Sequence, residues 1–149
     1  MRLKKVKDTK YLTIYCPEKS QLIGRPIVNE DIAAGFPSPA EDFMEVRISL
    51  DKELIKNKDA TFYARVRGNS MIDANIEDGD LLVIDRSIES RNGKIAVCMI
   101  DGEFTIKRLK VEKKCVYLMP ENKNYKPIKV TKENELIVWG IVTYVIKQV

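Results

Sequence analysis

The stretch Lys94–Leu109 reads KIAVCMIDGEFTIKRL and carries the clearest secondary-structure signal in the chain. Two runs rich in Val, Ile, Phe and Thr flank the pair Asp101-Gly102. An Asp-Gly pair between two such runs favours a tight β-hairpin, because both residues tolerate the positive φ angles of the turn. We therefore expect two antiparallel strands, Lys94–Ile100 and Glu103–Leu109.

Further short strands on both sides of this hairpin predict a mostly β fold. Turn residues such as Asp78-Gly79 and Asn92-Gly93 separate them. The expected strands are Tyr11–Cys16, Phe62–Arg67, Asp80–Asp85, Lys114–Met119, Ile128–Val130 and Leu136–Ile146, and one short helix is expected at Leu50–Asn57. Short strands at near-regular spacing favour one compact, mostly antiparallel β domain, and 149 residues suffice to bury its core.

The segment from Met1 to about Pro39 predicts a loosely structured N-terminal arm. It contains four of the six prolines and little sustained periodicity apart from Tyr11–Cys16. Residues 1–34 hold seven basic and four acidic side chains, so most of the net charge of +4 lies there. The rest of the chain is nearly neutral and lacks the basic patch of a nucleic-acid-binding protein. We expect no sequence-specific DNA binding, because the arm is too short for a three-helix DNA reader.

The composition excludes several kinds of site. The chain has no histidine, which removes Ser-His-Asp and Cys-His catalysis as well as His-ligated zinc. Neither a metal ion nor a cofactor is expected. Three widely spaced cysteines indicate free thiols in a reducing compartment, so we expect a cytoplasmic protein. No apolar run approaches the roughly 18–20 residues that span a bilayer, so no membrane association is expected.

Ser70 has the most distinctive context among the serines. It lies in Arg67-Gly-Asn-Ser-Met-Ile72, directly after an expected strand and at the start of a turn. A sharp strand-to-turn junction can expose a hydroxyl beside free backbone N–H groups, which together resemble a nucleophile and an oxyanion hole. A serine that caps the turn explains the same residues, so the local pattern leaves both interpretations open.

A serine nucleophile in a chain without histidine needs another base, and lysine is the available one. A lysine accepts a proton at neutral pH only when burial lowers its pKa. Lys107 lies in the strongest strand context, with Thr105 and Leu109 on its face and Phe104 and Ile106 on the other. The alternation does not show which face is buried, so a solvent-facing lysine remains the alternative.

Three segments together resemble one family. They are AGFPSPA at Ala34–Ala40, GNSMID at Gly68–Asp73 with IEDGDLLV at Ile76–Val83, and DGEFTIKRL at Asp101–Leu109. In this order and spacing they resemble the self-cleaving Ser/Lys peptidases of the LexA and UmuD type. The similarity runs from about Gly35 to Lys147, and the short N-terminal arm is UmuD-like.

The resemblance implies roles for particular residues. The chain would cut itself between Ala34 and Gly35, with Ser70 as nucleophile and Lys107 as base. The backbone N–H groups of Asn69 and Ser70 would form the oxyanion hole, and Thr105 would orient the lysine amine. Residues 1–34 would then be an arm that cleavage removes, and residues 35–149 a LexA/UmuD-like catalytic β domain.

The family also implies partners. We expect a homodimer that stays latent until a RecA–single-stranded-DNA filament stimulates cleavage in the SOS response. The processed form would join a translesion DNA polymerase as an accessory subunit. Two alternatives remain: a non-catalytic binding module of the same fold that regulates DNA repair or transcription, and a signal-peptidase-like enzyme, against which the missing membrane anchor counts.

Overall fold

Strands dominate the computed structural model, which describes residues 3–17, 25–27 and 46–149. The strands are β1 (Leu3–Asp8), β2 (Leu12–Pro17), β3 (Arg25–Ile27), β4 (Val46–Ile48), β5 (Thr61–Val66), β6 (Leu81–Asp85), β7 (Ile95–Ile100), β8 (Glu103–Val111), β9 (Val116–Met119), β10 (Ile128–Val130) and β11 (Leu136–Ile146); helix α1 spans Leu50–Leu54 and the 3₁₀ turn η1 spans Ile72–Ala74. The expected mostly β fold is confirmed, and every strand and helix expected from the sequence is present with bounds shifted by at most three residues.

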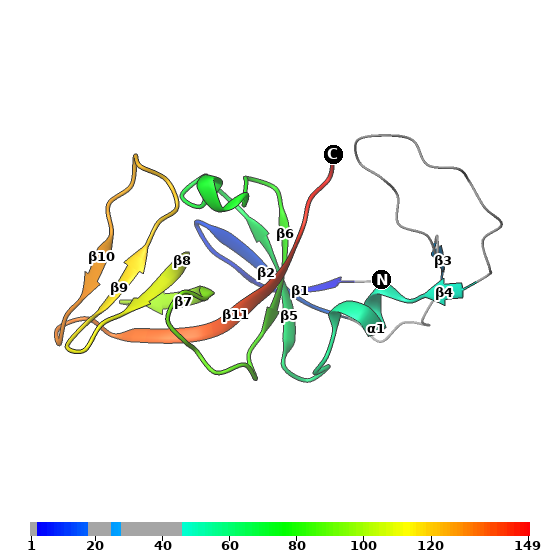
Figure 1. Cartoon of the computed structure of the whole chain (residues 1–149), viewed down its shortest axis with the longest axis horizontal. Helices are drawn as coiled ribbons and strands as arrows, with labels where there is room; N and C mark the ends of the chain where they lie inside the picture. The colour runs from blue at the N-terminus through cyan, green and yellow to red at the C-terminus, as the bar shows by residue number, and fades with distance from the viewer. Residues whose placement is uncertain (1–2, 18–24, 28–45) are drawn as a thin grey trace.

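Nine strands form one antiparallel sheet in the order β1-β2-β5-β6-β11-β7-β8-β9-β10. The long strand β11 joins its two halves, because Leu136–Ile141 pairs with β7 and Ile141–Ile146 pairs with β6 (Figure 1). The register of β11 shifts once in each half, and such bulges bend a strand and increase its twist. Gly140 lies at the crossing, where a Cβ atom would stand 2.5 Å from the Ile84 side chain.

The sheet curls on itself, so strands far apart in its order share one core. Leu12 and Ile14 of β2 belong to the same buried cluster as Phe104 and Ile106 of β8. The alternation of β8 explains this, because its even-numbered apolar side chains face this cluster and Leu109 joins a second one. Both faces of β8 are therefore buried, which is why the sequence pattern alone could not choose between them.

The N-terminal residues differ from the expectation. The strand expected at Tyr11–Cys16 is confirmed as β2. A loosely structured segment is wrong for residues 3–17 and 25–27, since β1 and β2 form a hairpin at the sheet edge and β3 pairs with β4. In β1 only Leu3 is half-buried, and the other five residues are exposed. Such a strand needs no apolar alternation, and its lysines are typical of an edge strand protected against pairing with other chains. The sequence pattern therefore did not predict β1, because its residues are mostly basic and exposed.

A second, two-stranded sheet pairs β3 with β4, with Ile27 opposite Val46. The two described ends of the segment that contains Ala34 and Gly35 therefore meet as strand partners. Ala34 and Gly35 themselves lie outside the described residues. Within the described ranges, no helix is long and apolar enough to cross a membrane.

Candidate active site

Ser70 lies in a tight loop between β5 and η1. The chain leaves β5 at Val66, and Gly68 turns it with a φ of +89°, a backbone conformation that favours glycine. The Gly68 N–H donates to the Asp78 carboxylate at 2.7 Å. Met71, the next residue after Ser70, is 1% exposed and anchors the loop in the core. The half-buried Ser70 hydroxyl is thus held between a fixed turn and a buried side chain.

Lys107 of β8 points to the same place. Its side chain is buried at 7% exposure, and no other basic residue in the described ranges is buried. The Nζ atom lies 3.3 Å from Ser70 Oγ, at the long end of hydrogen-bonding distance. It also donates to Thr105 Oγ1 at 2.8 Å and to the Ile106 carbonyl at 3.0 Å. A surface lysine, the alternative left open by the sequence, is therefore wrong for Lys107.

Burial sets the charge state of this lysine. Desolvation lowers the pKa of Lys107 below its ordinary value of 10.5, and the nearby Cys98 opposes this shift. Burial also raises the pKa of the Cys98 thiol to about 12, so the thiol is neutral near pH 7. Lys107 forms no ion pair with any carboxylate in the described part of the chain. Without a carboxylate counter-charge, burial favours the neutral amine of Lys107 more than it would at the protein surface.

A cleft of about 220 Å³ opens beside the two side chains. Its lining includes Tyr11 from the N-terminal hairpin, Asn69 and Ser70 from the loop, Thr105 and Lys107 from β8, and Tyr125. Within the described residues, the backbone N–H groups of Asn69 and Ser70 donate to no hydrogen bond. These two amides are thus available to a ligand oxygen in the cleft.

A segment after β9 holds the Ser70 loop from one side. The Glu121 N–H donates to the Ser70 carbonyl at 2.9 Å, and Asn122 Nδ2 donates to the Asn69 carbonyl at 2.8 Å. The Tyr125 hydroxyl donates to Asn69 Oδ1 at 2.9 Å. Sequence reasoning did not single out Glu121 or Asn122, because nothing local in the sequence shows that they contact residues some fifty positions earlier.

Arg67 is another residue that sequence reasoning did not single out. It directly precedes the Gly68-Asn69-Ser70 loop, and its backbone N–H donates to the Tyr11 carbonyl at 2.8 Å. The loop is thus held from two sides, by the Glu121–Tyr125 segment and by the N-terminal hairpin. Neither contact can be predicted from the sequence, because each joins residues some fifty positions apart.

The structure brings together Ser70, Lys107 and Thr105, three of the residues predicted from the resemblance, with the Asn69 and Ser70 amides beside them. No cluster of three or more His, Cys, Asp or Glu side chains that could hold a metal ion occurs in the described ranges. A buried amine beside a hydroxyl is suited to proton abstraction followed by nucleophilic attack.

Comparison with known proteins gives consistent matches. Residues 26–143 match the family described as Peptidase S24-like. Protein MucA of Salmonella typhimurium is 40% identical over 120 residues, which cover 80% of this chain and 82% of MucA. Protein ImpA of the same species is 39% identical over 122 residues, covering 82% and 83%. The LexA repressor of Clostridium kluyveri is 44% identical over 123 residues, covering 80% of this chain and 60% of the repressor.

Proposed function

The chain belongs to the Peptidase S24-like family as a LexA/UmuD-like member, and we propose that it cuts its own backbone once, between Ala34 and Gly35. Members of this family are self-cleaving serine peptidases. The observation that carries the proposal is the buried Lys107 amine, 3.3 Å from the Ser70 hydroxyl in a chain without histidine. A lysine with a pKa lowered by burial is the kind of base that such a chain requires.

The proposed reaction has two stages. The neutral Lys107 amine takes the Ser70 proton as Ser70 Oγ attacks the carbonyl carbon of Ala34. Lys107 then protonates the departing amine of Gly35, which leaves an ester between Ser70 and Ala34. Water, deprotonated by Lys107, hydrolyses this ester and restores Ser70. Lys107 returns its proton to Ser70 Oγ as the ester breaks, so the net change is one peptide bond and one water converted to a carboxylate and an ammonium group.

Three further groups have supporting roles in this proposal. We assign the Asn69 and Ser70 amides, which donate to no other group in the described residues, to the oxyanion that forms on the Ala34 carbonyl. Thr105 accepts a hydrogen bond from Lys107 Nζ at 2.8 Å, which orients the amine toward Ser70.

The biological role that we propose is in the SOS response, as for a UmuD-like protein. The relationship to MucA, ImpA and LexA supports this role. In this proposal the chain forms a homodimer, a RecA–single-stranded-DNA filament stimulates the cut, and the product serves a translesion DNA polymerase as accessory subunit. A non-catalytic binding module is disfavoured, because a binding surface needs no buried lysine beside a serine and burying a cation without a counter-charge is costly.

Self-cleavage is tested by incubating the purified full-length chain at pH 7 and at pH 10, with and without RecA filaments. We expect fragments of 34 and 115 residues. Cleavage should rise with pH as more Lys107 becomes neutral, and the rise should begin below the ordinary lysine pKa of 10.5, because burial lowers the pKa.

Variants identify the groups responsible. Ser70→Ala and Lys107→Ala should each abolish cleavage, whereas Lys110→Ala, which changes an exposed lysine on the same strand, should cleave like wild type. Absence of fragments from wild type under all conditions, or cleavage that persists in Ser70→Ala, would contradict the proposal.

A further inference from the structure

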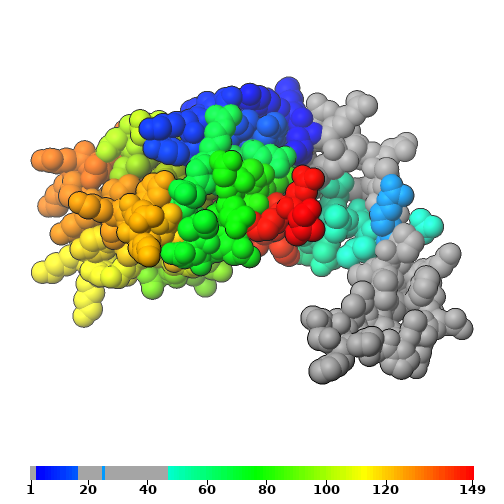
Figure 2. Space-filling model, turned by 90° about the horizontal axis from the view of Figure 1, so that it is seen from above, coloured from blue at the N-terminus to red at the C-terminus, as the bar shows by residue number. Residues whose placement is uncertain are grey.

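The hairpin of β1 and β2 is built into the core of the domain. β2 pairs with β5 over four residues, from Leu12 opposite Val66 to Tyr15 opposite Tyr63. Leu12 and Ile14 are 0% and 1% exposed and pack in the same cluster as Met71, the residue after Ser70. In Figure 2 the hairpin, in blue, lies along the green and yellow-green segments that follow it in sequence. The domain core is therefore completed by residues from the first seventeen of the chain.

β1 adds a contact to β8. Lys7 Nζ lies 4.9 Å from the centre of the Phe104 ring on β8. Phe104 in turn packs against Trp139, with ring centres 5.8 Å apart. The hairpin thus contacts both β5, which leads to Ser70, and β8, which carries Lys107.

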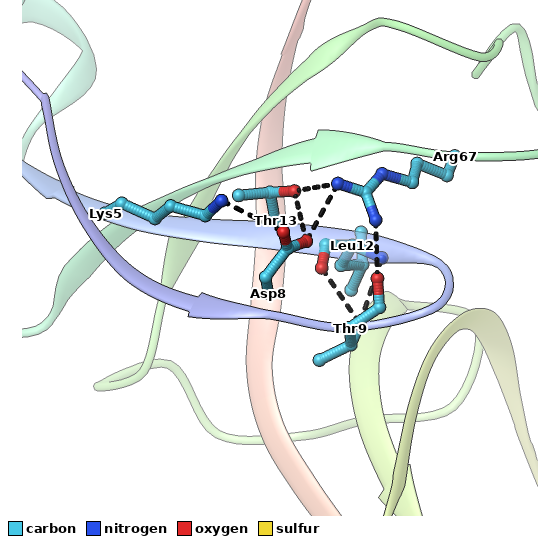
Figure 3. A network of polar contacts seen from close by, with 6 residues as sticks. All are labelled: Lys5, Asp8, Thr9, Leu12, Thr13 and Arg67. Atoms are coloured by element: carbon cyan, nitrogen blue, oxygen red, sulfur yellow. Dashed lines mark hydrogen bonds and ion pairs between the residues drawn. The ribbon is translucent and has the colours of Figure 1, made fainter.

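Arg67 binds the hairpin turn through its side chain as well as its backbone, and Figure 3 shows the side-chain contacts. One guanidinium nitrogen donates to the Thr9 carbonyl at 2.8 Å, and the other reaches Thr13 Oγ1 and Asp8 Oδ1, both at 2.8 Å. Lys5 also donates to the Asp8 carboxylate at 2.9 Å. A planar guanidinium that binds three acceptors at once fixes the turn in one orientation.

We propose that the segment upstream of the cut stays bound to the domain after cleavage, so that the processed protein is a complex of two chains. This inference rests on the proposed cut between Ala34 and Gly35. The hairpin, its β2–β5 pairing and the Arg67 contacts all lie outside the segment that is cut. Release would expose the apolar side chains around Leu12 and Ile14 and the edge of β5, both of which are unfavourable in water.

A second pairing supports retention. β3 lies upstream of Ala34 and pairs with β4, which lies downstream of Gly35. The upstream fragment is therefore joined to the domain at two places, and opening one of them leaves the other to hold the fragment nearby. Tyr11, which lines the cleft, would also remain in the product.

An engineered cut tests retention without self-cleavage. The full chain carries Ser70→Ala, an N-terminal affinity tag and the recognition sequence of a site-specific protease inserted between Ala34 and Gly35. After digestion with that protease, the tagged fragment is captured on resin in native buffer. We expect the larger fragment to be captured with it and to separate only in denaturant. Separation of the fragments in native buffer would overturn the inference.

Two matched arginine variants test how the fragment is held. Arg67→Ala should speed dissociation of the captured complex about tenfold, because it removes three contacts to the hairpin. Arg65→Ala should leave the dissociation rate unchanged, since this exposed arginine of β5 binds the Gly79 carbonyl and not the hairpin. Equal rates in the two variants would overturn the role of Arg67.

Self-cleavage and retention of the upstream fragment are tested independently of each other. A wild-type chain that never cuts itself would contradict the proposed function, while the engineered cut would still report whether the fragments remain together. Release after the engineered cut would contradict retention alone.

Discussion

The hairpin of residues 3–17 and the Glu121–Tyr125 segment both hold the Ser70 loop, but by different means. The hairpin contributes fully buried side chains, Leu12 and Ile14, and a strand of the sheet. The Glu121–Tyr125 segment contributes hydrogen bonds from half-buried and exposed groups, and its contacts are to Asn69, Ser70 and Asp73.

The two regions therefore contribute differently: the hairpin to the stability of the fold, and the Glu121–Tyr125 segment to the geometry of the Ser70 loop. Removing buried apolar surface costs the whole domain free energy, whereas losing one exposed hydrogen bond mainly loosens the groups that it joins. We therefore expect changes in the hairpin to lower the stability of the fold, and changes in the Glu121–Tyr125 segment to lower the rate of cleavage. The hairpin precedes the proposed cut in sequence and the Glu121–Tyr125 segment follows it. After cleavage the hairpin is therefore no longer covalently joined to the domain, whereas the Glu121–Tyr125 segment still is.

The largest effect is expected for Leu12→Ala. Truncating a fully buried leucine costs about 2–5 kcal/mol of unfolding free energy, which for a chain of this size lowers Tm by roughly 5–15 °C. Thermal unfolding followed by the fluorescence of Trp139, the single tryptophan, measures it. Val6→Ala is the control, because Val6 of β1 is 55% exposed and its truncation should leave Tm nearly unchanged. A similar Tm for both variants would show that the hairpin is not part of the core.

A smaller effect is expected for Tyr125→Phe, on rate and not on stability. The variant loses only the hydrogen bond to Asn69 Oδ1, worth about 0.5–1.5 kcal/mol, so self-cleavage should slow by roughly 2- to 10-fold. The pH dependence of the rate should stay the same, since no contact of Lys107 changes. Tyr144→Phe, at similar exposure on β11, is the control for both measurements. A fall in Tm as large as that of Leu12→Ala would contradict the division between the two regions.

The smallest effect on Tm is expected for Asp8→Asn, at the hairpin turn. Hydrogen bonds from Lys5 and Thr13, with Arg67 nearby, lower the pKa of Asp8 from 3.8 to about 2. A carboxylate with a lowered pKa stabilises the fold above its unfolded pKa, and this contribution disappears as the pH falls from about 4 to about 2. Wild type should therefore melt slightly above Asp8→Asn at pH 6, and the difference should vanish near pH 2.

The control for Asp8 is Glu89→Gln, which removes the carboxylate of an exposed pair with Arg91 away from the hairpin. It should leave Tm unchanged at both pH values. A difference between wild type and Asp8→Asn that persists at pH 2 would mean that Asp8 acts through something other than its charge.

Much of the fold could be predicted from the sequence, because the strands from β5 to β11, and β2, contain enough apolar residues to show a pattern. The Asp101-Gly102 hairpin is the clearest case. The strand β1 could not be predicted, since five of its six residues are exposed and its lysines leave no apolar alternation. For β8 the strand was predicted but its buried face was not, because both of its faces are buried in the curled sheet.

The candidate site, too, could be predicted only in part from the sequence. The sequence by itself determined that a hydrolase here cannot use histidine, and its resemblance to a family pointed to Ser70 and Lys107. Only the tertiary structure decided that Lys107 is buried beside Ser70, because a pKa depends on the solvent and charges around the group and not on its neighbours in sequence. Only the tertiary structure, likewise, showed that the N-terminal residues complete the core, since pairing between β2 and β5 joins residues some fifty positions apart.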